Sequence, residues 1–229
     1  MQVVSLRDGA LQTVSAASIA AGTNTFRTGI ESMDAICPRN GWRSGVHELL
    51  ADPGHMLMPL LLMRRATEQG FVVWSDPRGE LYLPAVAALG ARLDRLIILR
   101  PEDPREELWA INECLRCKGV AACVASLNHL SQLEARRLQL SAEHGGGLGI
   151  LMRPLQAIKQ PYAAATRWVI RSYPGERTVH RWKARLVHGH GGRVGESVVL
   201  EVSRDTNHVR ASKAMADRPA TPAAAAATA

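Results

Sequence analysis

The stretch Gly45–Met63 reads GVHELLADPGHMLMPLLLM and decides the fold of the chain. Its apolar opening predicts a buried strand over Val46–Leu50, and the run that begins at about Met56 predicts an apolar helix. A tight turn at Asp52–Gly54 joins the two. A strand, a glycine-containing turn and a helix in this order frame the phosphate-binding loop of nucleotide-binding α/β proteins. The stretch therefore predicts an α/β fold and marks the place where a nucleotide would bind.

The turn itself lacks the groups that hold phosphate. A working loop follows G-x-x-x-x-G-K-[ST], in which backbone N–H groups and the lysine contact phosphates and the hydroxyl binds magnesium. Here the turn carries Asp52, Pro53, Gly54 and His55, with neither a lysine nor a hydroxyl. Asp52 would repel phosphate, and Pro53 removes one N–H donor. The sequence therefore predicts a degenerate phosphate loop and no nucleotide cofactor.

Short apolar runs alternate with helical segments along the middle of the chain. The expected strands are residues 71–75, 96–99, 120–125 and 148–152. The expected helices are residues 28–37, 80–89, 102–117 and 131–144. Ser131 followed by Glu134 predicts a capping box at the start of the last helix. This alternation is typical of a twisted, mainly parallel sheet with helices on both faces.

The pattern changes after Pro154. Residues 166–171, 179–188 and 197–203 predict three strands joined by glycine-rich turns, which would extend the sheet in antiparallel fashion. We expect an N-terminal segment, residues 1–25, that is a short helix or mobile, and a core domain over residues 26–204. Residues 205–229 are rich in alanine and proline and predict a disordered tail.

Composition narrows the class of protein. The 229 residues have a net charge of +7 and a pI near 9.7, which permits contact with nucleic acid or an acidic partner. The same charge equally suits a basic protein from a GC-rich genome. No secretory signal and no apolar run of roughly 18 residues is found, so we expect a cytoplasmic protein without membrane contact.

Cysteines and histidines give weak signals. Cys114 and Cys117 form a C-x-x-C near the end of a predicted helix, where reduced structural cysteines are a better reading than a redox pair. A four-ligand zinc site is not indicated. Histidines cluster late in the chain at positions 180, 188, 190 and 208, where exposed turn residues are more common than metal ligands. We expect no metal.

A basic stripe lies on one of the last predicted strands. Arg181, Lys183 and Arg185 alternate with other residues and so share one face. This stripe is a candidate contact for DNA or an acidic partner, and a solvated polar face explains it equally well.

Several segments together resemble known proteins. They are GVHELL at 45–50, DPRGELY at 76–82, ELW at 107–109, LRC at 115–117, ARRLQL at 135–140 and ATRW at 165–168. In order and spacing they resemble the core of the RecA recombinases. They are more closely similar to the ImuA family, the RecA-like accessory proteins of bacterial translesion synthesis operons. The resemblance covers residues 26–204.

The resemblance implies that other parts of the RecA active site are lost as well. The position of the acidic residue that activates water falls near Arg78, and the position of the magnesium-associated aspartate falls at Ala125. The paired lysines that reach a neighbouring nucleotide fall near His188 and His190. Asp76 or Glu80 would be the remaining acids for an ATPase.

The DNA-binding loops of RecA also look shortened. Lys159 and Tyr162 remain as candidate contacts for a phosphate and a base. An ordinary connecting loop is the alternative.

The resemblance implies a non-catalytic accessory protein of SOS-induced, error-prone translesion DNA synthesis. Its implied partners are RecA, an ImuB-like Y-family polymerase homologue and an error-prone replicative-type DNA polymerase, with any DNA contact weak or indirect. Two alternatives remain open at this point. One is a RecA-type ATPase with an aberrant phosphate loop, and the other is a cell-division inhibitor similar to SulA.

Overall fold

The computed structural model describes residues 25–52, 55–174 and 178–212. Its main strands are β3 (Gly45–Ala51), β4 (Phe71–Ser75), β5 (Leu96–Leu99), β6 (Val120–Ser126), β7 (Leu148–Pro154), β8 (Thr166–Tyr173), β9 (Val179–Gly189), β10 (Ser197–Ser203) and β11 (Val209–Ala211). The α-helices are α1 (Glu31–Asp34), α2 (Leu57–Gln69), α3 (Leu83–Ala88), α4 (Pro104–Arg116) and α5 (Gln132–Gly145). Short 3-10 helices are η1 (Pro38–Asn40), η2 (Leu93–Arg95) and η3 (Leu155–Lys159).

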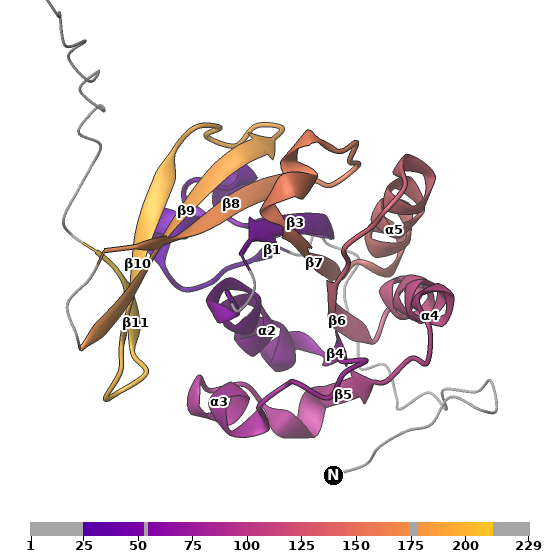
Figure 1. The fold of residues 1–229 in the computed structure, drawn as a ribbon, viewed down its shortest axis with the longest axis horizontal. Helices are drawn as coiled ribbons and strands as arrows, with labels where there is room; N and C mark the ends of the chain where they lie inside the picture. The colour runs from indigo at the N-terminus through magenta and orange to yellow at the C-terminus, as the bar shows by residue number, and fades with distance from the viewer. Residues whose placement is uncertain (1–24, 53–54, 175–177, 213–229) are drawn as a thin grey trace, which may run out of the picture.

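The main strands form one nine-stranded sheet in the order β11-β10-β9-β8-β3-β7-β6-β4-β5 (Figure 1). Strands β3 to β8 pair in parallel, whereas β9, β10 and β11 each pair antiparallel to their neighbours. A small second sheet joins β1 (Thr25–Phe26) to β2 (Trp42–Arg43). The predicted α/β fold with a parallel core and an antiparallel C-terminal extension is confirmed.

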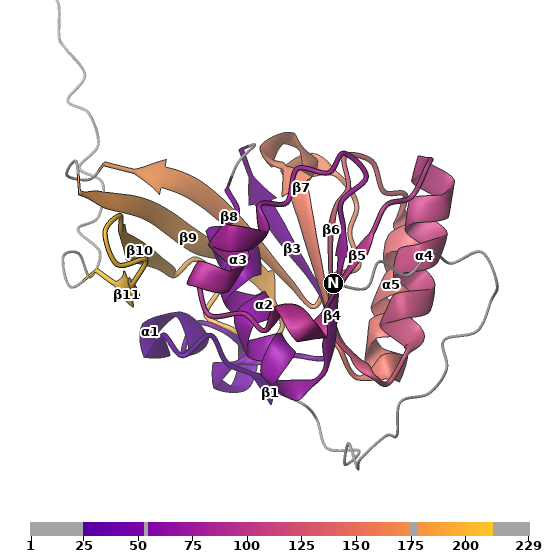
Figure 2. The same ribbon diagram turned by 90° about the horizontal axis from the view of Figure 1, so that it is seen from below.

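Helices cover both faces of the parallel strands. Figure 2 shows α4 and α5 on one side of the central strands and α1, α2 and α3 on the other. Each side has its own apolar core: α2 packs with Leu49, Trp168 and Leu200, and α4 and α5 pack with Val46 and Leu151. The antiparallel strands β8 to β10 extend away from α4 and α5 (Figure 1). None of the helices in the described residues is long and apolar enough to cross a membrane.

The two long helices that follow β5 and β6 begin at side-chain caps. The Asp103 carboxylate accepts hydrogen bonds from the Arg105 and Glu106 amides at the start of α4. At the start of α5, the Ser131 hydroxyl accepts from the Glu134 amide, and the Glu134 carboxylate accepts from the Ser131 amide at 2.7 Å. The predicted capping box is therefore present, and it satisfies amides that the helix itself leaves unpaired.

Two predicted helices are shorter in the structure than their apolar spacing suggested. The helix expected at 28–37 is reduced to α1, because the Asp34 carboxylate accepts from the Thr28 amide and hydroxyl and holds that segment as a turn. The helix expected at 80–89 begins only at Leu83, because the Asp76 carboxylate accepts hydrogen bonds from the Glu80 and Leu81 amides. In both places an aspartate holds the first residues of the expected helix in a non-helical turn.

The prediction of a disordered tail over residues 205–229 is wrong at its start. Residues 209–211 form β11, and the Glu201 carboxylate accepts hydrogen bonds from Arg210 and Ser212. These side-chain contacts hold a short edge strand that the sequence pattern did not indicate. The rest of that predicted tail, from residue 213, and the predicted N-terminal segment up to residue 24 lie outside the described residues.

Candidate functional site

The carboxyl ends of the parallel strands are where a ligand binds in sheets of this kind. Asp52 follows β3 at this edge and His55 precedes α2, whereas Pro53 and Gly54 lie outside the described residues. One ring nitrogen of His55 is 2.9 Å from the Asp52 carbonyl oxygen, and the other is 3.1 Å from the Ser172 hydroxyl on β8. The imidazole therefore ties the turn to a neighbouring strand.

An apolar hollow lies beside this turn. It is lined by His55, Leu57, Met58, Ile170, Trp182, Ala184 and Leu200. Apart from the histidine, these side chains carry no cation, and the Trp182 indole N–H is the one further hydrogen-bond donor among them. The Trp182 ring is turned toward His180, with 5.6 Å between the ring centroids. The turn and its surroundings therefore have the chemistry of a packed junction between α2 and β8–β10.

The acidic positions expected near the end of β4 are occupied in other ways. Asp76 is buried, and its two oxygens accept hydrogen bonds from the Glu80 and Leu81 amides at 2.8 and 3.2 Å. The Arg78 guanidinium lies at the surface, 2.9 Å from the Glu80 carboxylate. Asp76 thus holds the loop after β4, and Glu80 is paired with a cation.

The position implied for a magnesium-associated aspartate is Ala125. It is fully buried in β6, where its methyl group packs in the core beneath α4 and α5. A methyl group cannot ligate a metal, and the described residues contain no group of three or more histidine, cysteine, aspartate or glutamate side chains placed to do so.

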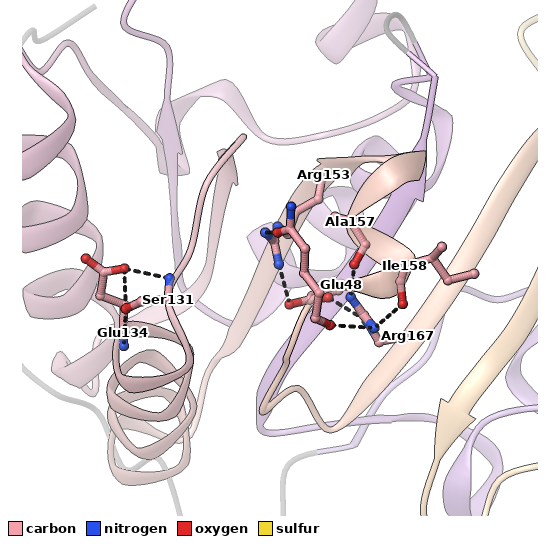
Figure 3. A network of polar contacts seen from close by, with 8 residues as sticks. Glu48, Ser131, Glu134, Arg153, Ala157, Ile158 and Arg167 are labelled. Atoms are coloured by element: carbon pink, nitrogen blue, oxygen red, sulfur yellow. Dashed lines mark hydrogen bonds and ion pairs between the residues drawn. The ribbon is translucent and has the colours of Figure 1, made fainter.

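A buried cluster of charges links three strands to η3 (Figure 3). Glu48 on β3 binds two arginines through its two oxygens: Oε1 lies 3.3 Å from Arg153 Nη1, and Oε2 lies 2.7 Å from Arg167 Nε. Arg167 also donates to the carbonyls of Ala157 at 2.7 Å and Ile158 at 3.2 Å. All three charged side chains are at most 3% exposed.

The sequence reasoning missed this cluster. The available signal was Glu48 itself, a charged residue inside an otherwise apolar strand that was expected to be buried. Buried charges are costly unless they are paired. Glu48 and Arg167 are direct register partners on β3 and β8, whereas Leu50 pairs with Arg153 on β7. The cluster therefore fixes the loop between β7 and β8 in place.

Tyr162 and the histidines expected near the paired-lysine positions lie next to this cluster. The Tyr162 hydroxyl is 2.8 Å from His188 Nδ1, and the Arg167 guanidinium lies 4.1 Å from the centre of the Tyr162 ring. The ring centroids of His188 and His190 are 5.0 Å apart. Partial burial, then the charges of His190 and Arg167, lower the pKa of His188. Tyr162 is thus engaged on one ring face and at its hydroxyl.

The residues proposed as nucleic-acid or partner contacts fall into two groups. Lys159 is exposed on η3, beside Tyr162 and the start of β8. Arg181, Lys183 and Arg185 share one face of β9, and Arg181 lies at the far end of that strand from His188. Seven residues of extended strand span about 23 Å. Arg181 therefore lies about 23 Å along β9 from His188, at the other end of the strand.

All four cysteines lie in described residues and are free. Cys37, Cys114 and Cys123 are buried, and burial raises the pKa of the Cys114 thiol to about 11. Cys117 is half-buried at the end of α4. A thiol with a raised pKa is a poor nucleophile, so Cys114 has the chemistry of a structural residue.

The outward surface of α4 and α5 carries exposed apolar side chains. Trp109 is 58% exposed, Leu133 is 61% exposed and Leu140 is 47% exposed. The two helices are held together by a 2.8 Å hydrogen bond from the Ser141 hydroxyl to the Asn112 amide oxygen. Leu133 and Leu140 are two helical turns apart on α5, with the exposed Arg136 and Arg137 between them.

Comparisons with known proteins agree with the fold and the motifs. The sequence is 30% identical to the ImuA protein of Caulobacter vibrioides over 151 residues, which cover 64% of this chain and 60% of that protein. It is 30% identical to the cell division inhibitor SulA of Pectobacterium atrosepticum over 109 residues, 47% of this chain and 64% of that protein. No family model matches the sequence.

A solved structure shows the same fold. The RadB recombinase superimposes with a TM-score of 0.62 at 13% sequence identity, over 81% of this chain and 98% of that one. The predicted likeness to ImuA and the predicted RecA-type fold are both confirmed.

Proposed function

Because the chain is ImuA-like and has a RecA-type fold, we propose that it is a non-catalytic accessory protein of SOS-induced translesion DNA synthesis. In this proposal it acts in the bacterial cytoplasm and binds RecA, an ImuB-like Y-family polymerase homologue and, through that assembly, an error-prone replicative-type polymerase. The similarity to ImuA supports the pathway. The packed end of the parallel strands supports a role that does not need ATP turnover.

The proposal that the protein is non-catalytic rests on one observation. The polar groups near the expected nucleotide site are already bound by other parts of the chain. His55 bridges Asp52 and Ser172, Asp76 is bound by two backbone amides, and Ala125 stands at the implied metal position. Phosphoryl transfer needs a cation and a metal on the phosphates and a group that orients the attacking water. The described residues around this turn supply none of these parts in an available form.

The first prediction follows directly. We expect the purified protein to release no phosphate from ATP above the buffer rate, with or without single-stranded DNA, while RecA is active in the same assay. Titration calorimetry should show no heat of ATP binding. Hydrolysis that disappears in the Glu80→Gln or Asp76→Asn variant, with the thermal unfolding of the variant unchanged, would contradict the proposal.

The surface best suited to a protein partner is the outward face of α4 and α5. Tryptophan and arginine are enriched among the residues that dominate binding energy at protein interfaces. Trp109, Leu133 and Leu140 supply apolar contact area on this face, and Arg136 and Arg137 give it positive charge. A partner segment that carries aliphatic and acidic side chains is complementary to it.

The second prediction tests this docking face. A Trp109→Ala and Leu140→Ala double variant should weaken capture of RecA or of the polymerase homologue by at least about tenfold, since truncating a hot-spot residue costs roughly 2 kcal/mol or more. Tyr82→Ala is the matched control, because Tyr82 is 70% exposed and precedes α3 on the opposite side of the sheet. Equal loss in the control, or no binding of either partner by the unchanged protein, counts against the proposal.

The similarity to SulA supports a second candidate, inhibition of cell division. It covers less of this chain than the similarity to ImuA does. Filamentous growth of cells that express the chain, in the absence of any binding to RecA or the polymerase homologue, would favour this candidate.

A further inference from the structure

Among the described residues, the antiparallel strands at the end of the sheet have one face in the apolar core and one open face that carries the exposed Arg171, Arg185 and Arg210. Side chains on the face toward α2 are part of the core, and they include Trp168, Ile170, Ala184, Leu186 and Leu200. Because successive side chains of a strand point to opposite faces, the residues between these positions point the other way. That second face lies on the same side of the sheet as α4 and α5, but β8 to β10 extend beyond those helices (Figure 1).

The strand register arranges the open face in three cross-strand rows. The first row is Val169, Arg185 and Ser197. The second row is Arg171, Lys183 and Val199. The third row is Tyr173, Arg181, Glu201 and Arg210. We call these residues the basic face.

Positive charge dominates the basic face. Its five cations are Arg171, Arg181, Lys183, Arg185 and Arg210. Among the described residues of these rows Glu201 is the one acid, so five positive charges and one negative charge leave an excess of four. Glu201 lies 2.8 Å from Arg181 and 3.0 Å from Arg210. The hydrogen bond from the Ser212 hydroxyl and these two arginines lower the pKa of its carboxyl, so it is ionised at neutral pH.

The placement of these cations is unfavourable for the isolated fold. Arg171 and Lys183 are direct cross-strand neighbours, and like charges in that arrangement destabilise a sheet. On this face Glu201 is already shared between Arg181 and Arg210, which leaves Arg171, Lys183 and Arg185 without an acid in their own rows. A bound polyanion would remove this repulsion.

The chemistry of the face favours nucleic acid over the other polyanions. Among the described residues, the large apolar side chains that are exposed are Tyr82, Leu93, Trp109, Leu133, Leu140, Ile158 and Val194, and none of these lies in β8 to β11. A stable membrane-surface site would combine such charge with exposed apolar side chains that insert. A protein interface would need an apolar anchor at its centre. A phosphate backbone needs neither.

We propose that the basic face binds the phosphate backbone of a nucleic-acid strand, with Arg171, Lys183 and Arg185 as the phosphate contacts. Same-face positions along a strand are about 6.6 Å apart, so the rows present a regular series of cations to an extended polyanion. The contacts are to phosphate, so binding is independent of base sequence and weakens steeply with salt. This inference goes beyond the accessory function and does not depend on the docking face of α4 and α5.

The test is fluorescence anisotropy of the full chain with a labelled single-stranded DNA of about 30 nucleotides at low salt. An Arg171→Gln and Lys183→Gln double variant should lower the slope of log affinity against log salt by about 1.4, since each phosphate contact on a single strand contributes about 0.7. The Arg171→Glu and Lys183→Glu variant should bind at least about tenfold more weakly. The matched control is Arg100→Glu with Lys118→Glu, which makes the same change in net charge in exposed loops outside the basic face.

Three outcomes would overturn the proposal. They are no binding by the unchanged protein at about 50 mM salt, an equal loss of affinity in the Arg100 and Lys118 control, and binding of poly-glutamate as tight as binding of DNA. Thermal unfolding of each variant separates loss of binding from loss of fold. The assay contains neither ATP nor a protein partner, so its failure would leave the accessory function standing, and failure of the partner assays would leave this inference standing.

Discussion

Replacing Glu48 by alanine should lower the free energy of unfolding by about 3–5 kcal/mol, the range found when one partner of a buried ion pair is removed. Glu48 is the acid for both Arg153 and Arg167, and all three side chains are buried. Without it, two guanidinium groups would face one another in the interior with only carbonyl and amide oxygens as partners. The loss is large because a charge buried without its partner costs more than the ion pair itself contributes.

The measurement is urea unfolding followed by circular dichroism. The matched control is Glu80→Ala, which removes the exposed ion pair with Arg78 and should change stability by less than about 1 kcal/mol. We also expect the η3 segment of the Glu48→Ala variant to be cut first by protease, because Arg167 would no longer be held in place to bind the Ala157 and Ile158 carbonyls. A Glu48→Ala protein as stable as the Glu80→Ala control would show that the cluster does not hold the loop.

Most of the fold could be predicted because the parallel strands are apolar on both faces. Runs such as Phe71–Ser75 and Leu96–Leu99 are short, continuous and bounded by turns, and the structure places strands at those residues. The helices that begin at Asp103 and Ser131 were marked by their caps. Where prediction went wrong, a single side chain decided the outcome. Asp34 holds the first residues of an expected helix in a turn in this way.

The candidate functional site likewise has features that the local sequence predicts and features that it does not. The absence of a lysine and a hydroxyl after β3 is a local property, so the sequence alone predicted the degenerate phosphate loop. The position of the His55 ring depends on Ser172, which is 117 residues away in the chain. The pairing of Glu48 with Arg167 depends on strand register across 119 residues. Such long-range contacts follow from topology, and no local pattern shows them.

The basic face was predictable in part from the local sequence and in part only from the strand register. Alternation along β9 was enough to place Arg181, Lys183 and Arg185 on one side of the strand. The sequence did not show that Arg171 lies opposite Lys183 or that Glu201 is shared by two arginines. Because Glu201 is already paired with Arg181 and Arg210, Arg171 and Lys183 face each other without an acid in their row. The face therefore has a local excess of positive charge.

Acid should destabilise the protein through His47, and this is the second large effect that we expect. The ring is buried between Thr166 and the Arg43 backbone: Nδ1 lies 2.7 Å from the Thr166 hydroxyl and Nε2 lies 2.8 Å from the Arg43 carbonyl. Because a carbonyl can only accept, Nε2 carries the proton and Nδ1 accepts from the hydroxyl. A second proton would have to bind Nδ1, which would break the hydrogen bond that Nδ1 accepts from the Thr166 hydroxyl. Burial, and to a lesser extent the charge of Arg43, lower the pKa of His47 to about 4, against the backbone hydrogen bond that raises it.

The sign of the pH dependence follows from linkage. An unfolded histidine takes up a proton near pH 6.5, whereas the folded protein resists until about pH 4. The stabilising difference is therefore fully present above about pH 6.5 and is lost as the pH falls to 4, for a total of about 3 kcal/mol. Urea unfolding at several pH values in this window measures it. The His47→Gln variant keeps a donor for the Arg43 carbonyl but cannot titrate. Between about pH 6.5 and 4 it should therefore lose about 3 kcal/mol less stability than the unchanged protein. If both proteins lose stability in parallel, another group is responsible, because removing His47 would then have left the proton linkage unchanged.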